Sequence, residues 1–239
     1  MRIGDSVQLS VDMLNRARRF TPEQRPRQVL GEAAMLHACI AVDATGKRMT
    51  GGPVGERFTA AIREHLDILS AVGLPAMDLA RTRFPYPSLR VTPKERGGEP
   101  DIADLLYLQH RCTLGHGDEV PLVFSLIPHD DVPGNYPVQF TSEAIRLPEI
   151  VVYGLLAIVV LAPVNAGERT QDAIVPWARG PLVANDWWGR VEDFRTELES
   201  SGFNRFQLDE TPVLSPNAPL IDIARATMQR SGIPELKQL

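Results

Sequence analysis

Apolar residues recur at intervals of three or four positions along much of the chain, which is the spacing of one helix face. This pattern predicts helices at residues 10–19, 26–47, 55–72, 100–114 and 148–164. In the second of these segments, the residues at helical spacing are Val29, Leu30, Ala33, Leu36, His37, Ile40 and Ala41. The sequence therefore predicts a mainly α protein.

Between residues 119 and 147 the pattern changes from helical to extended. Residues 119–128 and 136–147 are typical of two short strands, and the turn-rich segment 129–135 joins them. We therefore expect a small inserted β-hairpin at 119–147.

Beyond Gly167 the chain becomes rich in loops, with further helices expected at 185–200 and 220–231. The predicted organisation is a helical domain at 1–170 and a helical C-terminal extension at 171–239. We expect the extension to pack on the same core, where Trp187 and Trp188 would cover it from a surface helix.

The longest apolar run, residues 150–164, is too short to cross a bilayer as a helix. Fifteen helical residues extend about 22 Å, whereas the hydrocarbon core is about 30 Å thick. The run is expected to be a buried helix, or a pair of buried strands, and no membrane partner is predicted.

Composition narrows the possible functions. The formal net charge of −5 argues against a protein that coats nucleic acid through many basic residues, but it permits a local basic site. Cys39 and Cys112 lack the spacing of a disulfide framework or a zinc site, and no secretion signal is visible. We interpret both as reduced core residues of a cytoplasmic protein, and we predict neither a metal nor a cofactor. His37, Asp43 and His65 fit no metal-ligand pattern and are interpreted as core or surface residues.

Residues 73–100 form a long, proline-rich, basic loop. Arg83, Arg90 and Lys94 are candidate RNA contacts because aromatic residues lie between the basic ones and offer stacking surfaces. A solvated loop without a ligand is the alternative interpretation.

The strongest chemical signal is the pair Arg111 and His116. The helix at 100–114 is expected to end at Gly115, so the chain can turn His116 back toward the arginine. Arginine can hold a phosphate through two parallel hydrogen bonds, and histidine can exchange a proton near neutral pH. With 22 arginines and 5 histidines in 239 residues, such a pair at one fixed offset is expected by chance about 0.5 times. The alternative is an ion pair of Arg111 with Asp104 or Asp118, with His116 capping the helix.

Residues 106–121, which contain this pair, resemble the motif of the HEPN superfamily of helical ribonuclease domains found in prokaryotic toxin and defence systems. The resemblance implies a HEPN-like helical bundle in which Arg111 clamps the phosphate and His116 is the acid–base group of a metal-independent endoribonuclease. It also implies RNA as the partner, a homodimer, and a possible antitoxin or other protein partner.

The chain departs from this motif at one position. Catalytic members commonly carry a polar residue directly after the arginine, where this chain has Cys112. A non-catalytic HEPN-like dimeric module that binds RNA or protein therefore remains an alternative, as does an unrelated helical protein.

Overall fold

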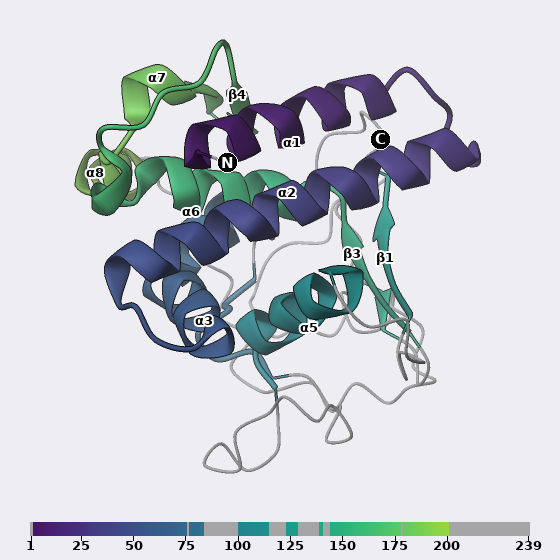
Figure 1. Cartoon of the computed structure of the whole chain (residues 1–239), viewed down its shortest axis with the longest axis horizontal. Coiled ribbons are helices and arrows are strands. Elements are labelled where there is room, and N and C mark those ends of the chain that lie inside the picture. Colours follow the sequence, from purple (N-terminus) through teal and green to yellow (C-terminus); the bar gives the residue numbers. More distant parts are fainter. Residues whose placement is uncertain are drawn as a thin grey trace, which may run out of the picture.

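The structure is a computed structural model that describes residues 2–75, 77–83, 100–114, 123–128, 139–140, 144–177 and 179–200. For residues 109–114, 123–125, 139–140 and 144–145 it describes the backbone alone. The protein is mainly helical, as the sequence predicts (Figure 1). The predicted helix at 220–231 lies outside the described residues, as does most of the basic loop.

The first two helices form an antiparallel pair. Helix α1 (Ile3–Ala17) begins seven residues before its predicted start, and α2 (Arg25–Met49) closely matches its prediction. The buried side of α1 includes Ile3, Val7, Val11 and Leu14. Within this interface the Ser10 hydroxyl donates to the carbonyl oxygen of Ala34 at 2.7 Å, so a buried polar side chain is satisfied.

The most deeply buried side of α2 differs from the residues that the hydrophobic spacing emphasised. Val29 is 51% exposed, whereas the buried positions are mostly small. They are Arg27, Gly31, Ala34, Met35, Ala38, Cys39, Ala41, Val42, Thr45 and Gly46. Small side chains let neighbouring elements approach closely. Helix α2 packs against α1, α3 (Val54–Glu64), α5 (Ile102–Leu114), α6 (Val151–Leu161) and β1 (Val123–Ile127).

Gly46 marks the closest approach of α2 to α3 (Val54–Glu64). A Cβ atom at this position would lie 2.2 Å from the carbonyl oxygen of Arg57. The same turn of α3 is held by Arg57, whose guanidinium donates to both carboxylate oxygens of Asp43 at 2.7 Å.

Gly46→Ala is expected to destabilise the protein by about 1–3 kcal/mol, because the new methyl group forces α2 and α3 apart. Urea unfolding followed by circular dichroism measures the loss. Gly167→Ala is the matched control, because a Cβ there meets nothing within 4 Å, and it should change stability by less than about 0.5 kcal/mol. Equal stability of the two variants would contradict the close approach.

The predicted single helix at 55–72 is wrong at its centre, where His65 separates α3 from α4 (Leu66–Val72). His65 leaves helical geometry with φ −126° and ψ 32°. Its buried ring places Nδ1 2.9 Å from the carbonyl oxygen of Ala61, so the side chain bonds to the end of α3. The interruption at His65 lets the axes of α3 and α4 differ in direction.

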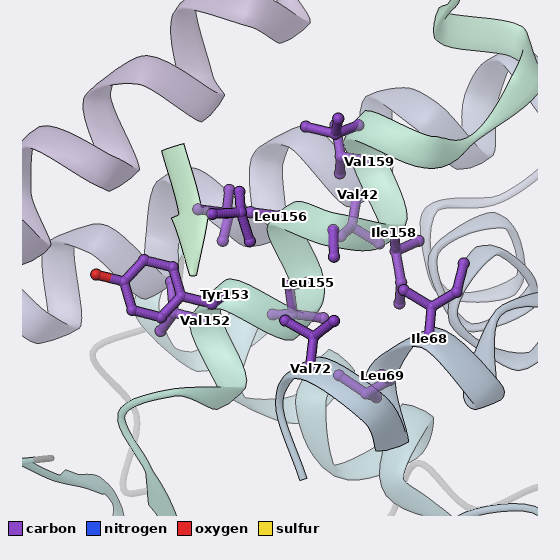
Figure 2. Packing of buried hydrophobic residues seen from close by; sticks show 14 of the residues in the cluster. Val42, Ile68, Leu69, Val72, Val152, Tyr153, Leu155, Leu156, Ile158 and Val159 are labelled. Carbon is purple, nitrogen blue, oxygen red and sulfur yellow. The ribbon is translucent and has the colours of Figure 1, made fainter. Parts of the chain in front are cut away.

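Helix α6 (Val151–Leu161) is the centre of the core, and every one of its residues is buried. Figure 2 shows its aliphatic side chains among Val42 of α2 and Ile68, Leu69 and Val72 of α4. The segment is a buried helix, which is the first of the two interpretations of the apolar run at 150–164, and not a pair of buried strands. Gly73, at the end of α4, and Gly154, in α6, let the backbones of these two helices come into contact. A Cβ on Gly154 would lie 2.8 Å from the Cα of Gly73.

The predicted β-hairpin at 119–147 is wrong in its pairing. Strands β1 (Val123–Ile127), β2 (Gln139–Phe140) and β3 (Ala144–Pro148) form a sheet in the order β1-β3-β2. The two long strands, β1 and β3, are parallel, and only the short β2 pairs antiparallel with β3. A parallel pair needs a crossover connection longer than a tight turn, which alternating hydrophobicity does not reveal.

The C-terminal part contains a hairpin that the sequence did not predict, formed by β4 (Ile174–Trp177) and β5 (Gly180–Val183). The helix predicted at 185–200 is two, α7 (Ala184–Trp187) and α8 (Val191–Ser200). Gly189, with φ 78°, lies at the break. Residues of this part belong to the same buried cluster as α6: Ala173, Val175, Leu182, Ala184, Trp188, Val191, Phe194 and Leu198.

Candidate functional site

The candidate site lies at the C-terminal end of α5 (Ile102–Leu114), and the other end of this helix is firmly anchored. The Arg63 guanidinium donates from Nε to Asp101 at 2.7 Å and from Nη2 to Asp104 at 2.7 Å. Both carboxylates also accept backbone N–H groups of the first turn, at 3.0 to 3.1 Å. The negative charge of the two carboxylates also interacts favourably with the positive end of the helix dipole. Through Arg63, which belongs to α3, the start of α5 is fixed to α3.

The two carboxylates of this anchor have opposite pKa shifts. Burial alone would raise the pKa of Asp101, but hydrogen bonds from Arg63 and from the Asp104 backbone outweigh it, and the pKa is lowered. Burial raises the pKa of Asp104, and the neighbouring Asp101 carboxylate raises it further. The pair shares one arginine, which donates two hydrogen bonds to Asp101 and one to Asp104.

The side of α5 that faces α3 continues from Asp104 to Tyr107. The ring of Tyr107 lies 5.8 Å from that of Phe58, and it also fills the space above Gly55. Arg111 is one helical turn beyond Tyr107 and two turns beyond Asp104, so its Cα lies on this same side of the helix. The described part of α5 extends to Leu114, and Gly115 follows in the sequence.

Of the predicted site residues, the structure describes only Arg111 and Arg83. Arg111 is described by its backbone in the last turn of α5, and His116, Arg90 and Lys94 lie outside the described residues. Arg83 is described at the start of the basic loop, where its Nη1 donates to the carbonyl oxygens of Ala80 and Thr82 at 3.0 and 2.9 Å. The meeting of Arg111 and His116 therefore stays a prediction.

Only one of the two alternative partners of Arg111, Asp104, lies among the described residues. Asp104 accepts a hydrogen bond from Arg63, so an ion pair with Arg111 would have to share this carboxylate. Asp118, the other alternative, lies outside the described residues.

The other polar candidates of the sequence have structural roles or isolated positions. Asp43 binds Arg57, and His65 is buried against Ala61. His37 is half-buried on α2, its Nδ1 has no hydrogen-bond partner, and burial lowers its pKa. Cys39 is buried, as expected, and burial raises the pKa of its thiol. Within the described ranges, no group of three or more acidic, histidine or cysteine side chains could hold a metal ion.

A buried ion pair, which sequence analysis did not predict, joins α2 to the start of α6. Arg27 Nη2 donates to the Glu149 carboxylate, and both side chains are only 4% exposed. Arg27 Nε and Nη1 are buried without a hydrogen-bond partner. Above this pair, the Arg18 guanidinium lies 5.6 Å from the centre of the Tyr153 ring. The available signal was a single glutamate at the start of the most apolar segment of the chain.

Comparison with known proteins places this architecture in a family. The model of the Rv1289 family matches residues 23–214, which include α2 through α8. The chain belongs to the Rv1289 family. Relatives in it are the uncharacterized protein Rv1289 of Mycobacterium tuberculosis (strain H37Rv) and the uncharacterized protein Mb1320 of Mycobacterium bovis. Each is 37% identical to this chain over 198 residues, covering 81% of this chain and 86% of the relative. No solved structure matches the chain.

The segment shared with the Rv1289 family includes Arg111 and His116, and also the Arg27–Glu149 pair. Among the described helices, α2 is long and apolar enough to cross a membrane by length and composition. This is weak evidence, because core helices of soluble proteins pass the same test, and half of the apolar stretch of α2 is buried inside the fold.

Proposed function

We propose that this protein is a metal-independent endoribonuclease of the HEPN-like toxin or defence type, with Arg111 and His116 as its catalytic residues. The observation that supports the proposal is the position of Arg111 on α5. The described part of this helix extends to Leu114, and His116 follows two residues later in the sequence. Gly115 and Gly117 flank this histidine and give the chain the freedom to fold back toward the arginine.

The proposed reaction needs only these two side chains and the RNA itself. The ribose 2′-hydroxyl attacks the adjacent phosphorus, its proton passes to an imidazole, and the bond from phosphorus to the 5′-oxygen breaks. The departing 5′-oxygen takes a proton from an imidazolium, which leaves a 2′,3′-cyclic phosphate and a 5′-hydroxyl. The guanidinium of Arg111 stabilises the charge that develops on the phosphate oxygens.

A homodimer suits this chemistry, because two copies of His116 could serve as base and acid. The anchor of Arg63 on Asp101 and Asp104 supports the proposal in a second way, since it holds α5 rigidly against α3. A rigid helix would present Arg111 in a fixed position. We propose a cytoplasmic location and a protein partner that neutralises the activity.

One residue favours a second candidate function. Cys112 follows Arg111, where catalytic HEPN members commonly carry a polar side chain. The second candidate is therefore a non-catalytic dimeric module of the same type that binds RNA or a protein.

We expect the purified protein to cleave a mixed RNA substrate in the presence of EDTA, leaving cyclic phosphate ends. Arg111→Ala and His116→Ala should each lower the cleavage rate by about 100-fold or more, because they remove phosphate stabilisation and proton transfer. Gel electrophoresis of end-labelled RNA measures the rates.

His110→Ala is the matched control for this assay. It removes an imidazole next to Arg111 in the same helix, but adjacent helical residues do not share a face. Its rate should stay within a factor of about two of wild type, since surface substitutions are usually nearly neutral. Failure of the wild-type protein to cleave, or equal rates for all three variants, would refute the nuclease proposal.

A further inference from the structure

The turn between α1 and α2 carries an exposed cluster of arginines, which we call the arginine turn: Arg16, Arg18, Arg19 and Arg25. Glu23 is the only acidic residue between positions 16 and 27. No ion pair joins these four arginines to a carboxylate in the part of the chain that the structure describes. The turn projects from the end of the α1–α2 pair (Figure 1).

Several other arginines of the described chain are paired with carboxylates. Arg48 binds Glu168 at 2.6 Å, Arg57 binds Asp43 at 2.7 Å, and Arg195 binds Asp67 at 2.8 Å. The protein therefore neutralises guanidinium groups by carboxylates in several places. The concentration of unpaired ones on a single turn leaves a local positive charge on a chain whose net charge is −5.

The start of α2 strengthens the positive field of the arginine turn. Arg25 is the first residue of α2, and the first turn of this helix has no acidic residue to oppose its positive dipole. Arg27 is buried and paired with Glu149, so it is not one of the exposed charges of the turn.

Aromatic surfaces accompany these charges. Phe20, in the middle of the turn, is 37% exposed. The Arg18 guanidinium lies 5.6 Å from the centre of the Tyr153 ring in a cation–π contact, which holds one guanidinium in place. Guanidinium groups beside an exposed ring are the combination that binds single-stranded nucleic acid, because phosphates bind the charges and bases stack on the ring.

We propose that the arginine turn binds the phosphate backbone of single-stranded RNA. The proposal draws on the proposed function only for the choice of RNA as the ligand. An anionic membrane fits this surface less well, because stable attachment usually needs an apolar helix face that inserts into the lipid. The apolar side of α1 is already buried, and Phe20 is the one large apolar side chain exposed within the turn itself.

The test is the binding of a fluorescein-labelled polyuridine oligonucleotide, measured by fluorescence anisotropy at several salt concentrations. All proteins carry His116→Ala, so that binding is measured without cleavage. The test variant adds Arg19→Glu and Arg25→Glu, which should fold because residue 19 follows α1 and a glutamate suits the first turn of α2. The matched control adds Arg169→Glu and Arg190→Glu, two exposed arginines outside the turn, with the same change in net charge.

We expect the Arg19/Arg25 variant to bind at least about 10-fold more weakly than the control, and the salt dependence of its affinity to fall by the contribution of about two phosphate contacts. Equal binding by both variants, or no binding of the oligonucleotide by their common parent, would overturn the proposal. Binding of vesicles of phosphatidylcholine and phosphatidylserine without binding of RNA would also overturn it, in favour of a membrane site. Cleavage is measured separately, on protein without these substitutions. A failure of the RNA-binding proposal therefore leaves the nuclease proposal unaffected, and a failure of the nuclease proposal leaves the binding proposal unaffected.

Discussion

Glu149→Ala is expected to destabilise the protein by about 3–5 kcal/mol, one of the two largest losses we predict for a single substitution. Arg27 and Glu149 are each only 4% exposed in their side chains, so the guanidinium would remain in the interior without its counter-charge. Two of its nitrogen atoms, Nε and Nη1, already lack hydrogen-bond partners. Urea unfolding followed by circular dichroism measures the change in the free energy of unfolding.

Two further variants test whether Glu149→Ala loses stability because it leaves a buried charge unpaired or only because it removes packing contacts. Arg27→Met combined with Glu149→Leu removes both charges and keeps similar volumes, so it should recover most of the lost stability. Asp193→Ala breaks the exposed pair with Arg190, whose side chains are 52% and 58% exposed, and should cost less than about 1 kcal/mol. If Glu149→Ala proved as mild as Asp193→Ala, the pair would not be isolated from water as the structure shows.

The sequence predicted those elements whose burial leaves a simple pattern. Helix α6 is apolar on every side, so no choice of face was needed to find it. For α2 the bounds were predicted well but the buried side was not, because its innermost positions are small or polar, as at Gly31, Ala34 and Arg27. Hydrophobic spacing favours large apolar residues, whereas the close approach of several elements selects small ones.

Contacts between distant segments were the part that the sequence could not supply. The strands at β1 and β3 were expected, but their parallel pairing depends on the path of the chain between them. The ion pair of Arg27 with Glu149 joins residues 122 positions apart, which no local pattern encodes. At the candidate site, the sequence correctly placed Arg111 in a helix, whereas the predicted helix end at Gly115 lies outside the described residues. It gave no indication that Arg63 anchors the other end of this helix.

Phe194→Ala is expected to cost about 3–5 kcal/mol and to lower the stability of the whole protein, not only of its C-terminal part. Phe194 is fully buried in the same cluster as α6. Its ring lies 4.8 Å from that of Trp177 and 6.1 Å from that of Trp187. Removing the ring leaves a cavity between α8 and the β4–β5 hairpin, and its cost is shared by every element packed on this core.

The positions of the tryptophans allow a direct test of whether Phe194→Ala lowers the stability of the whole protein. All three of its tryptophans, Trp177, Trp187 and Trp188, lie in the C-terminal part, so their fluorescence reports unfolding there. Circular dichroism reports mainly the helices that precede it. In a single cooperative unit the two signals change at the same urea concentration, and Phe194→Ala shifts both equally. Val183→Ala, at a side chain that is 36% exposed on β5, should shift them by less than about 1 kcal/mol. A tryptophan transition that moves alone would instead make the C-terminal part a separate folding unit.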